Sequence, residues 1–243
     1  MATTLCLDFG NTRLKWAIFS GGEIRFTGVL TGDGLDDLGE CIETYKPDKC
    51  MLSSVVNHTE AIEELLKSRT HFHKLDHHSR IPITTPVGKP ETIGADRLAL
   101  VVAAAHDFPH KNNLVIGLGS AVTYNYINRY HQFIGGSISP GMEMRFKSLE
   151  LLTAKLPLVT PHWNFPLLGY DTKTNIQSGV LIGLAKEIDG VIEAYEERYN
   201  NLHVLMTGGD AHYFLPLTKK KITLDPNLIF KGIYVISEHN LSI

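Results

Sequence analysis

Four apolar segments of this chain end in turns of small polar residues, a type of turn that binds phosphate groups. They are LCLDFGNTRLK at 5–15, LVIGLGSAVTYN at 114–125, HQFIGGSISPG at 131–141 and VLMTGGDA at 204–211. Glycine lets a ligand approach the backbone closely, and successive N–H groups in such turns form anion-binding concavities. A single turn of this kind also fits an ordinary hairpin. Four of them in one chain indicate a polyphosphate site.

The first of these turns carries the most chemistry. Asp8 ends an apolar run, where it could orient magnesium, directly or through water, beside a polyphosphate. Gly10, Asn11 and Thr12 supply donors for phosphate oxygens, and Lys15 adds a positive charge. The alternative is a plain β-turn with Asn and Gly at its corner and Lys15 in solvent.

A second acidic group stands in IGADR at 93–97, at the expected start of a helix. Asp96 could accept the proton of an attacking hydroxyl, and Arg97 could hold a carboxylate or phosphate through two hydrogen bonds. The alternative is structural, because acidic residues are common near helix N-termini, where they complement the helix dipole.

Other nucleotide and metal motifs are missing or incomplete. The sequence has no Walker A segment and no protein-kinase signature set. GLGS at 117–120 falls short of the dinucleotide fingerprint. Four histidines occupy a polar stretch that we interpret as a solvated loop rather than a metal site. They are His71, His73, His77 and His78.

Composition indicates an ordinary globular protein of 243 residues, with 43% hydrophobic and 20% charged residues. The net charge of −3 argues against a nucleic-acid partner. Three cysteines without a C-x-x-C motif indicate a reducing compartment. No signal peptide and no apolar stretch of membrane-spanning length is apparent. We therefore expect a soluble cytoplasmic protein with no membrane partner.

Strands and helices must position these groups. The first half predicts three strands joined by tight turns, then a helix, a strand and a second helix. The expected ranges are 3–8, 14–20, 23–30, 35–45, 50–56 and 58–68. Asn57 is expected to cap the second helix, with Glu60 three residues on. Residues 71–93 are expected to be irregular and 94–106 helical.

The second half repeats this order loosely after a polar linker at 106–113. Three strands are expected, followed by a long amphipathic helix over 175–199, a strand at 202–209 and a helical tail.

Taken together, the motifs resemble those of type III pantothenate kinases. The family patterns are D-x-G-N-T-x-x-K, G-x-D-R, G-T-A-x-T-x-D and G-G-x-I-x-P-G, followed by a Thr-containing segment and a late T-G-G turn. The similar segments here are DFGNTRLK at 8–15, IGADR at 93–97, GSAVTYN at 119–125, GGSISPG at 135–141, DTKTNIQSG at 171–179 and TGGDA at 207–211. They occur in order and cover nearly the whole chain.

The resemblance implies the α/β fold of the actin-like ATPase and sugar kinase superfamily. Two ribonuclease-H-like domains, 1–112 and 113–243, would flank a nucleotide cleft. The implied reaction is ATP-dependent phosphorylation of pantothenate to 4′-phosphopantothenate, the first step of coenzyme A biosynthesis. The implied cofactors are ATP, magnesium and a monovalent cation, potassium or ammonium. The implied assembly is a homodimer.

The resemblance also implies roles for individual residues. Asp96 would be the catalytic base, and Asp8 would be the magnesium residue. The nucleotide would contact Asp8, Phe9, Gly10, Asn11, Thr12, Arg13, Leu14, Lys15, Gly119, Ser120, Thr123, Asn128, Gly208 and Gly209. Pantothenate would contact Val87, Gly94, Ala95, Asp96, Arg97 and Thr172. Asn125 would be the residue of the monovalent cation site.

Two positions depart from the family pattern. Asn125 stands where the family usually has Asp, and an amide oxygen brings no charge to a cation. Val87 stands where the family often has Tyr. These departures leave open a kinase of the same fold with another hydroxyl acceptor. A separate alternative is a non-enzymatic nucleotide-binding transcription regulator. The acidic pair Asp8 and Asp96 argues against the regulator.

Overall fold

A computed structural model describes residues 2–85 and 90–241 of the chain. It divides into two compact units. The first unit holds the described residues up to His110, Arg129–Ile134 and the described residues from Asn227 on. The second unit holds Lys111–Asn128 and Gly135–Pro226.

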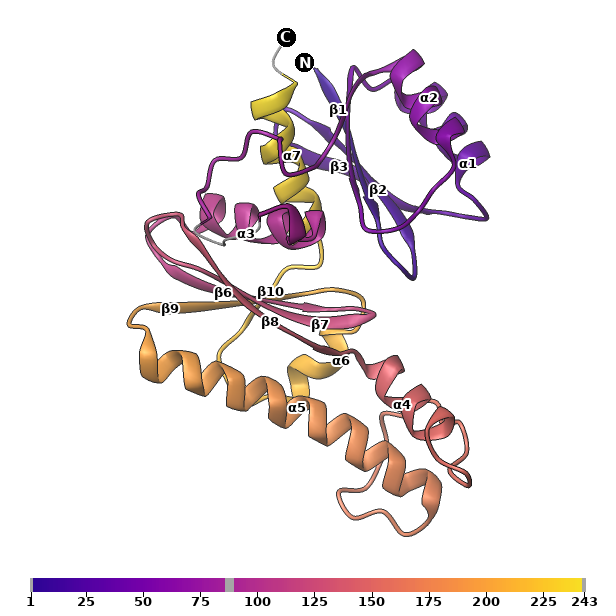
Figure 1. Cartoon of the computed structure of the whole chain (residues 1–243), viewed down its shortest axis with the longest axis vertical. Coiled ribbons are helices and arrows are strands. Elements are labelled where there is room, and N and C mark those ends of the chain that lie inside the picture. The colour runs from indigo at the N-terminus through magenta and orange to yellow at the C-terminus, as the bar shows by residue number, and fades with distance from the viewer. Residues whose placement is uncertain (1, 86–89, 242–243) are drawn as a thin grey trace. The chain divides into compact units, whose positions relative to one another are not determined.

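The first unit is built on a mixed five-stranded sheet with helices on both faces (Figure 1). Its strands are β1 (Thr3–Phe9), β2 (Leu14–Ser20), β3 (Glu23–Leu30), β4 (Lys49–Ser54) and β5 (His71–Lys74), in the order β3-β2-β1-β4-β5. The first three strands are antiparallel neighbours, whereas β4 pairs in parallel with both β1 and β5.

Alternating side chains of β1 serve the two faces of this sheet. Leu5, Leu7 and Phe9 belong to the apolar core formed with α1 (Leu35–Tyr45) and α2 (Glu60–Arg69). The intervening side chains, including Asp8, point to the opposite face because side chains alternate along a strand. That face is covered by α3 (Ala95–Asp107) and α7 (Leu228–Asn240) (Figure 1).

Helices α3 and α7 pack closely because small residues stand at their contact. A Cβ atom added to Gly232 would lie 1.8 Å from the carbonyl oxygen of Ala99, so only glycine fits there. The chain's last described helix therefore packs beside the helix that carries Asp96. The compact units differ here from the predicted domain ranges, which gave residues 113–243 to one half.

The second unit repeats the architecture. Its strands are β6 (Asn112–Leu118), β7 (Ala121–Ile127), β8 (Phe133–Pro140), β9 (Leu202–Thr207) and β10 (Thr223–Leu224), in the order β10-β9-β6-β7-β8. Read from β8, this is the order of the first sheet, with β6 in the position of β1. Strand β6 likewise pairs antiparallel with β7 and parallel with β9. The first residues of β8 group with the first unit.

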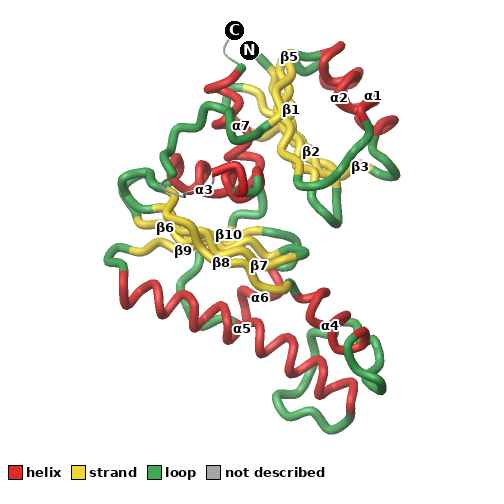
Figure 2. Tube along the Cα trace, viewed as in Figure 1, coloured by secondary structure: helices red, strands yellow, loops and turns green. Residues whose placement is uncertain are grey.

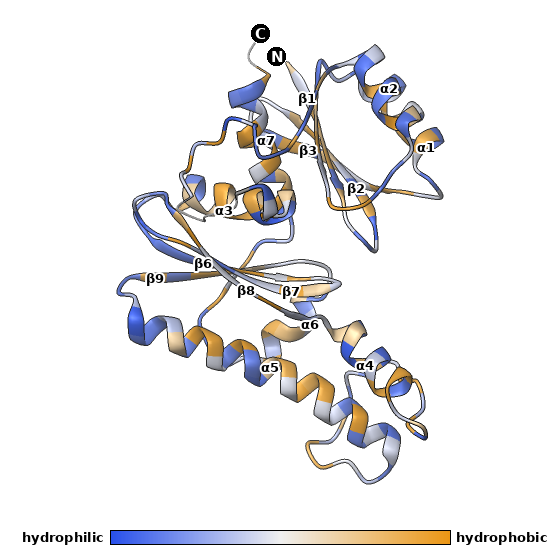
Figure 3. Ribbon diagram, viewed as in Figure 1, coloured by the Kyte–Doolittle hydropathy of each residue, from blue (hydrophilic) through white to orange (hydrophobic). Residues whose placement is uncertain are grey.

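The long helix α5 (Thr172–Arg198) covers one face of the second sheet (Figure 1). Leu181, Leu184 and Ile188 are fully buried in its core. Apolar and polar segments alternate along α5 in Figure 3, as an amphipathic helix requires. Asp171 and Thr174 form a capping box that starts the helix. The helix α4 (Met142–Leu151) precedes it, and a loop over 152–171 joins the two (Figure 2).

Several sequence predictions needed correction. Asn57 does not cap α2, which begins at Glu60 after Thr59. The stretch expected to be irregular contains β5 and the 3-10 helix Pro90–Thr92. Helices α4 and α6 (Ala211–Phe214), the 3-10 helix Leu215–Leu217 and β10 were not predicted. Strand β5 is polar and pairs only with β4, so its sequence lacks an alternating apolar pattern.

Among the described helices, none has both the length and the apolar character needed to cross a membrane.

Candidate active site

The turn between β1 and β2 presents the first predicted phosphate segment. The N–H of Gly10 donates to the carbonyl oxygen of Arg13 at 3.1 Å, which closes a four-residue turn. Asn11, Thr12 and Arg13 are exposed at its tip. Phe9 is buried in the core beneath the turn. The turn is thus anchored at its base and open to solvent at its tip, as a phosphate-binding loop must be.

Three polar side chains form a row across the sheet beside this turn. Asp8 is paired with Lys15 of β2 and with Ser53 of β4. Residues opposite each other in neighbouring strands have their side chains on the same face. Ser53 is 1% exposed, and its hydroxyl has no hydrogen-bond partner among the described residues.

Asp8 is an unusual carboxyl group because it is half-buried in a sheet and its pKa is shifted upward. Burial raises its pKa to about 6, the positive charge of Lys15 opposes that shift, and the negative charge of Asp96 adds to it. The Asp8 carboxyl therefore lies close enough to Asp96 for the two charges to interact. Carboxyl groups of this kind are often functional.

Asp96 lies in the first turn of α3 and folds back toward the residue before the helix. Its Oδ1 accepts a hydrogen bond of 2.8 Å from the N–H of Arg97. A Cβ atom added to Gly94 would lie 2.5 Å from this same oxygen, so glycine makes room for the carboxylate. Burial raises the pKa of Asp96, while the N–H and the charge of Arg97 oppose the rise. A raised pKa makes the carboxylate a better proton acceptor.

Arg97 projects from the same turn of α3 toward the start of β8. Its guanidinium lies 5.7 Å from the centre of the Phe133 ring. Ala95 stands between Gly94 and Asp96. Val87, the remaining predicted substrate residue of this unit, lies outside the described residues.

The glycine turns of the second unit converge at the carboxyl end of β6. A Cβ atom on Gly141 would lie 2.3 Å from the carbonyl oxygen of Gly119, and one on Gly208 would lie 2.1 Å from that of Leu118. The N–H of Gly141 donates to Ser120 at 3.2 Å. The turns at Gly119–Ser120, Pro140–Gly141 and Gly208–Gly209 therefore pack backbone against backbone. Three separate motifs form one glycine-rich surface.

Two other predicted nucleotide residues lie along β7. Thr123 is paired with Gly117, close to these turns. Asn128 follows the last residue of β7, eight residues after Ser120. A strand rises about 3.3 Å per residue, which separates Asn128 from Ser120 by roughly 25 Å. The structure therefore does not bring Asn128 together with the glycine turns.

Asn125 is fully enclosed in β7. Its side-chain amide donates to the carbonyl oxygen of Val115 at 3.3 Å and to the Thr123 hydroxyl at 3.0 Å. The first bond ties β7 to its neighbour β6, and the second lies within β7. Asn125 thus has a structural role whether or not a cation lies near this strand.

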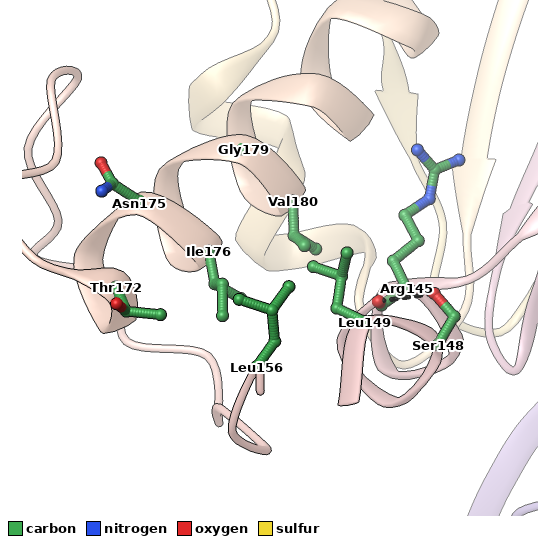
Figure 4. Close-up of a pocket in the computed structure, with 9 residues that line it drawn as sticks. All are labelled: Arg145, Ser148, Leu149, Leu156, Thr172, Asn175, Ile176, Gly179 and Val180. Atoms are coloured by element: carbon green, nitrogen blue, oxygen red, sulfur yellow. Dashed lines mark hydrogen bonds between the residues drawn. The ribbon is translucent and has the colours of Figure 1, made fainter. Parts of the chain in front are cut away.

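Thr172 lines a cavity of about 620 Å³ between α4 and α5, drawn in Figure 4. Leu149, Leu156, Ile176 and Val180 give the cavity apolar walls. Thr172 is in the first turn of α5, and its side chain lies on the same side of that helix as Ile176 (Figure 4). The cavity can take an apolar group with a polar contact at one end.

Sequence reasoning missed a polar network beside this cavity. Arg145 of α4 donates to the Pro140 carbonyl oxygen at 2.8 Å and to the Ser139 hydroxyl at 2.9 Å, and it forms an ion pair with Glu187 of α5. Glu187 also accepts a hydrogen bond of 2.9 Å from Tyr124. The network holds the Pro140–Gly141 turn in place. Tyr124 and Glu187 are 63 residues apart in the sequence, so no local motif predicts this network.

Within residues 2–85 and 90–241, no group of three or more His, Cys, Asp or Glu side chains could hold an ion. Magnesium bound beside a polyphosphate needs only one or two carboxylates, because waters and phosphate oxygens supply the other ligands. The half-buried Asp8 fits that requirement, and so does the Ser53 hydroxyl, for which the described part of the chain offers no hydrogen-bond partner.

Comparison with known proteins identifies the family. A model of the family described as type III pantothenate kinase matches residues 4–194. The chain belongs to this family. The type III pantothenate kinase of Cytophaga hutchinsonii is 41% identical over 237 residues, covering 98% of this chain and 99% of that protein. The one of Christiangramia forsetii is 35% identical and covers 97% of this chain and 98% of its own.

Solved structures agree on the fold. A Campylobacter jejuni protein assigned to the Baf family of transcriptional activators gives a TM-score of 0.62 at 22% identity, covering 98% of this chain and 100% of that one. A ROK family protein of Streptococcus pneumoniae gives a TM-score of 0.51 at 11% identity, covering 99% and 100%. The predicted actin-like ATPase and sugar kinase fold is thereby confirmed.

Membership of the type III pantothenate kinase family gives the chain its activity. It is an ATP-dependent kinase that phosphorylates pantothenate in coenzyme A biosynthesis. The predicted family, enzyme class and reaction are confirmed. The acidic residues Asp8 and Asp96 are candidates for roles in that reaction.

Proposed function

We propose that Asp96 is the general base of pantothenate phosphorylation and that Asp8 orients the magnesium ion of ATP. The observation that carries this proposal is that the first unit holds two half-buried carboxyl groups with raised pKa values, and that the charge of Asp96 contributes to raising the pKa of Asp8. Burying even part of two neighbouring carboxyl groups costs free energy, which a purely structural pair would not repay. Binding a cation would give Asp8 a function, and accepting a proton would give Asp96 one.

In the proposed reaction, the pantothenate hydroxyl oxygen forms a bond to the γ-phosphorus of ATP. Its proton passes to the carboxylate of Asp96, and the bond between the γ-phosphorus and the bridging oxygen breaks to release ADP. The hydrogen bond from the N–H of Arg97 holds the Asp96 carboxylate in a fixed direction. Magnesium, when bound, neutralises charge on the phosphates.

Further nucleotide contacts are proposed in each unit taken by itself. The turn from Asp8 to Lys15 would bind phosphate oxygens through its N–H groups, its Asn11 and Thr12 side chains and the Lys15 ammonium. In the second unit, the glycine-rich surface would contact the nucleotide, together with Ser120 and Thr123. Asn128 is the weakest member of this set because of its distance along β7.

Pantothenate would be held by the residues around Asp96. Arg97 offers a guanidinium that suits the carboxylate of pantothenate. Gly94 and Ala95 allow the substrate to approach the helix terminus. Thr172 would contribute a hydroxyl at the end of its apolar cavity.

The monovalent cation is proposed to bind near β7. Asn125 replaces the usual aspartate, so the site would lack one negative charge and bind potassium or ammonium more weakly. Because Asn125 is buried and donates to the Val115 carbonyl oxygen, part of its effect on cation affinity would come from holding β7 in position beside β6.

We also propose a cytoplasmic homodimer. Six large apolar side chains from the end of α4 and the following loop are exposed, and apolar surface of this kind marks protein interfaces. They are Leu151, Leu152, Leu158, Leu167, Leu168 and Tyr170.

A coupled ADP-release assay tests the proposed acceptor. ATP should be consumed with pantothenate, and much more slowly with other hydroxyl compounds of similar size. Faster turnover with a different acceptor would favour the alternative of a kinase with the same fold and another substrate. The valine at position 87, where the family often has tyrosine, is the reason for considering that alternative.

A further inference from the structure

The hydroxyl of Ser53 is an isolated polar group in an otherwise satisfied strand. It is 1% exposed and has no partner in the described part of the chain. A buried polar group without a hydrogen bond costs free energy, so such groups are rare in folded proteins and indicate a missing ligand, water or ion.

The position of Ser53 indicates what that missing partner is. Ser53 is paired with Asp8 across the parallel strands β1 and β4, and Asp8 is paired with Lys15 on its other side. The three side chains share the sheet face that α3 and α7 cover. The backbone of Ser53 therefore lies one strand spacing, about 4.8 Å, from that of Asp8, the residue proposed to orient magnesium.

The chemistry of the pair suits a hydrated divalent cation. Magnesium keeps several of its waters when it binds to proteins, and those waters need hydrogen-bond acceptors. A carboxylate and a neighbouring hydroxyl on one face supply two acceptors without adding a second charge. Neutral Ser53 also avoids adding to the repulsion between Asp8 and Asp96.

We infer that Ser53 is a positioning residue of the magnesium site, where its hydroxyl accepts a hydrogen bond from a water of the hydrated ion that Asp8 orients. The inference rests on the proposed role of Asp8 and deepens it. It makes the end of β4 a part of the site, although no phosphate-binding motif lies there.

The adjacent serine provides a matched control. Ser54 points to the opposite face, and its hydroxyl is already satisfied: it donates to the Val56 carbonyl oxygen at 2.9 Å and lies 3.2 Å from His58 Nδ1. Removing the Ser54 hydroxyl breaks bonds within the protein. Removing the Ser53 hydroxyl breaks none among the described residues.

The experiment measures how much magnesium strengthens nucleotide binding. Titration calorimetry with a non-hydrolysable ATP analogue, in magnesium and in EDTA, gives a ratio of dissociation constants for each variant. We expect Ser53→Ala to reduce this ratio about three- to tenfold, the effect of one lost hydrogen bond. Its melting temperature without metal should be unchanged or higher. Ser54→Ala should leave the ratio unchanged and lower the melting temperature.

The variant Asp8→Asn distinguishes a failure of the proposed role of Asp8 from a failure of the inferred role of Ser53. If Asp8→Asn leaves the ratio unchanged, the proposed role of Asp8 is wrong. If Asp8→Asn reduces the ratio and Ser53→Ala does not, the role of Ser53 is overturned while that of Asp8 stands. Ser53→Cys, which nearly keeps the side-chain volume, repeats the test should Ser53→Ala fold poorly, and a ratio equal to that of the wild type would again overturn the inference.

Discussion

At the scale of single residues, Asp96 has the position expected of a proton acceptor. Its carboxylate is fixed by the N–H of Arg97, and its pKa is raised by burial. We expect Asp96→Asn to fold and bind ATP normally but to lower kcat about 10²- to 10⁴-fold, the usual contribution of a general base. Single-turnover kinetics and nucleotide titration measure the two effects. Near-normal turnover would remove Asp96 from the mechanism.

Asp8 is expected to make stability depend on pH. Its pKa is raised from the ordinary value of 3.8 to about 6 in the folded state, so the folded protein binds more protons than the unfolded chain between these values. The contribution of Asp8 to stability therefore falls as pH rises through this window, and the cost of its charge is fully present above pH 6.

Asp8→Asn should consequently be more stable than the wild type at pH 8, and the difference should vanish near pH 4. Urea unfolding across this pH range measures the free energy of unfolding of both proteins. Curves that stay parallel would show that the Asp8 carboxyl is not strained by burial in solution.

Asn125 gives a third prediction, which concerns the cation. An aspartate there would place a negative charge against the Val115 carbonyl oxygen, where the amide now donates. We expect Asn125→Asp to be destabilised in a large organic cation and to recover in potassium, with half-saturation of activity at a lower potassium concentration than in the wild type. Thermal unfolding and activity across a potassium series at constant ionic strength provide the test. An equal loss of stability in both salts would speak against a cation site at this residue.

At the scale of elements, the start of α3 is shaped by the space that Gly94 leaves. An added Cβ would lie 2.5 Å from Oδ1 of Asp96, and the carboxyl would have to turn away. Because the clash is with the end of a flexible side chain, and φ of Gly94 is −59°, an alanine fits the backbone. We expect Gly94→Ala to lower kcat about 10- to 100-fold, as a small misplacement of a catalytic group does, with little change in stability.

Gly39→Ala is the matched control for this prediction. Gly39 lies within α1, and an added Cβ would meet nothing within 4 Å. The control should be more stable by about 0.5–1 kcal/mol, because alanine is the better helix former, with kcat unchanged. A Gly94→Ala protein with normal kcat would mean that the orientation of Asp96 is not set at this helix start.

At the scale of the whole molecule, the loop between α4 and α5 is expected to form the subunit contact. Leu168 is 84% exposed and lies among the other apolar side chains of that loop. We expect Leu168→Glu to convert the proposed dimer to a monomer, as measured by light scattering coupled to size exclusion. Tyr130→Glu, at an exposed apolar position in the first unit, should leave the dimer intact. A dimer that persists in Leu168→Glu would place the contact elsewhere.

The sequence by itself determined the family, the fold class and most strands. Glycine turns, apolar alternation and the order of the motifs can be recognised in the sequence, because each depends on residues that are close together along the chain. Asp8, Gly10 and Asp96 could be selected because each belongs to a short recognisable segment. Even the loose repeat of the element order along the chain could be anticipated, since strands that end in glycine turns recur in both halves.

Only the tertiary structure decided which of these residues meet. Pairing of β1 with β4 brings Ser53 beside Asp8 across 45 positions of sequence, and packing of α3 on the same sheet face brings Asp96 near them. The last described helix, α7, joins the first unit because Gly232 fits against Ala99. Strand pairing and helix packing are contacts between distant residues, and the free energy that selects them comes from the burial of whole faces, which no single segment of the chain contains.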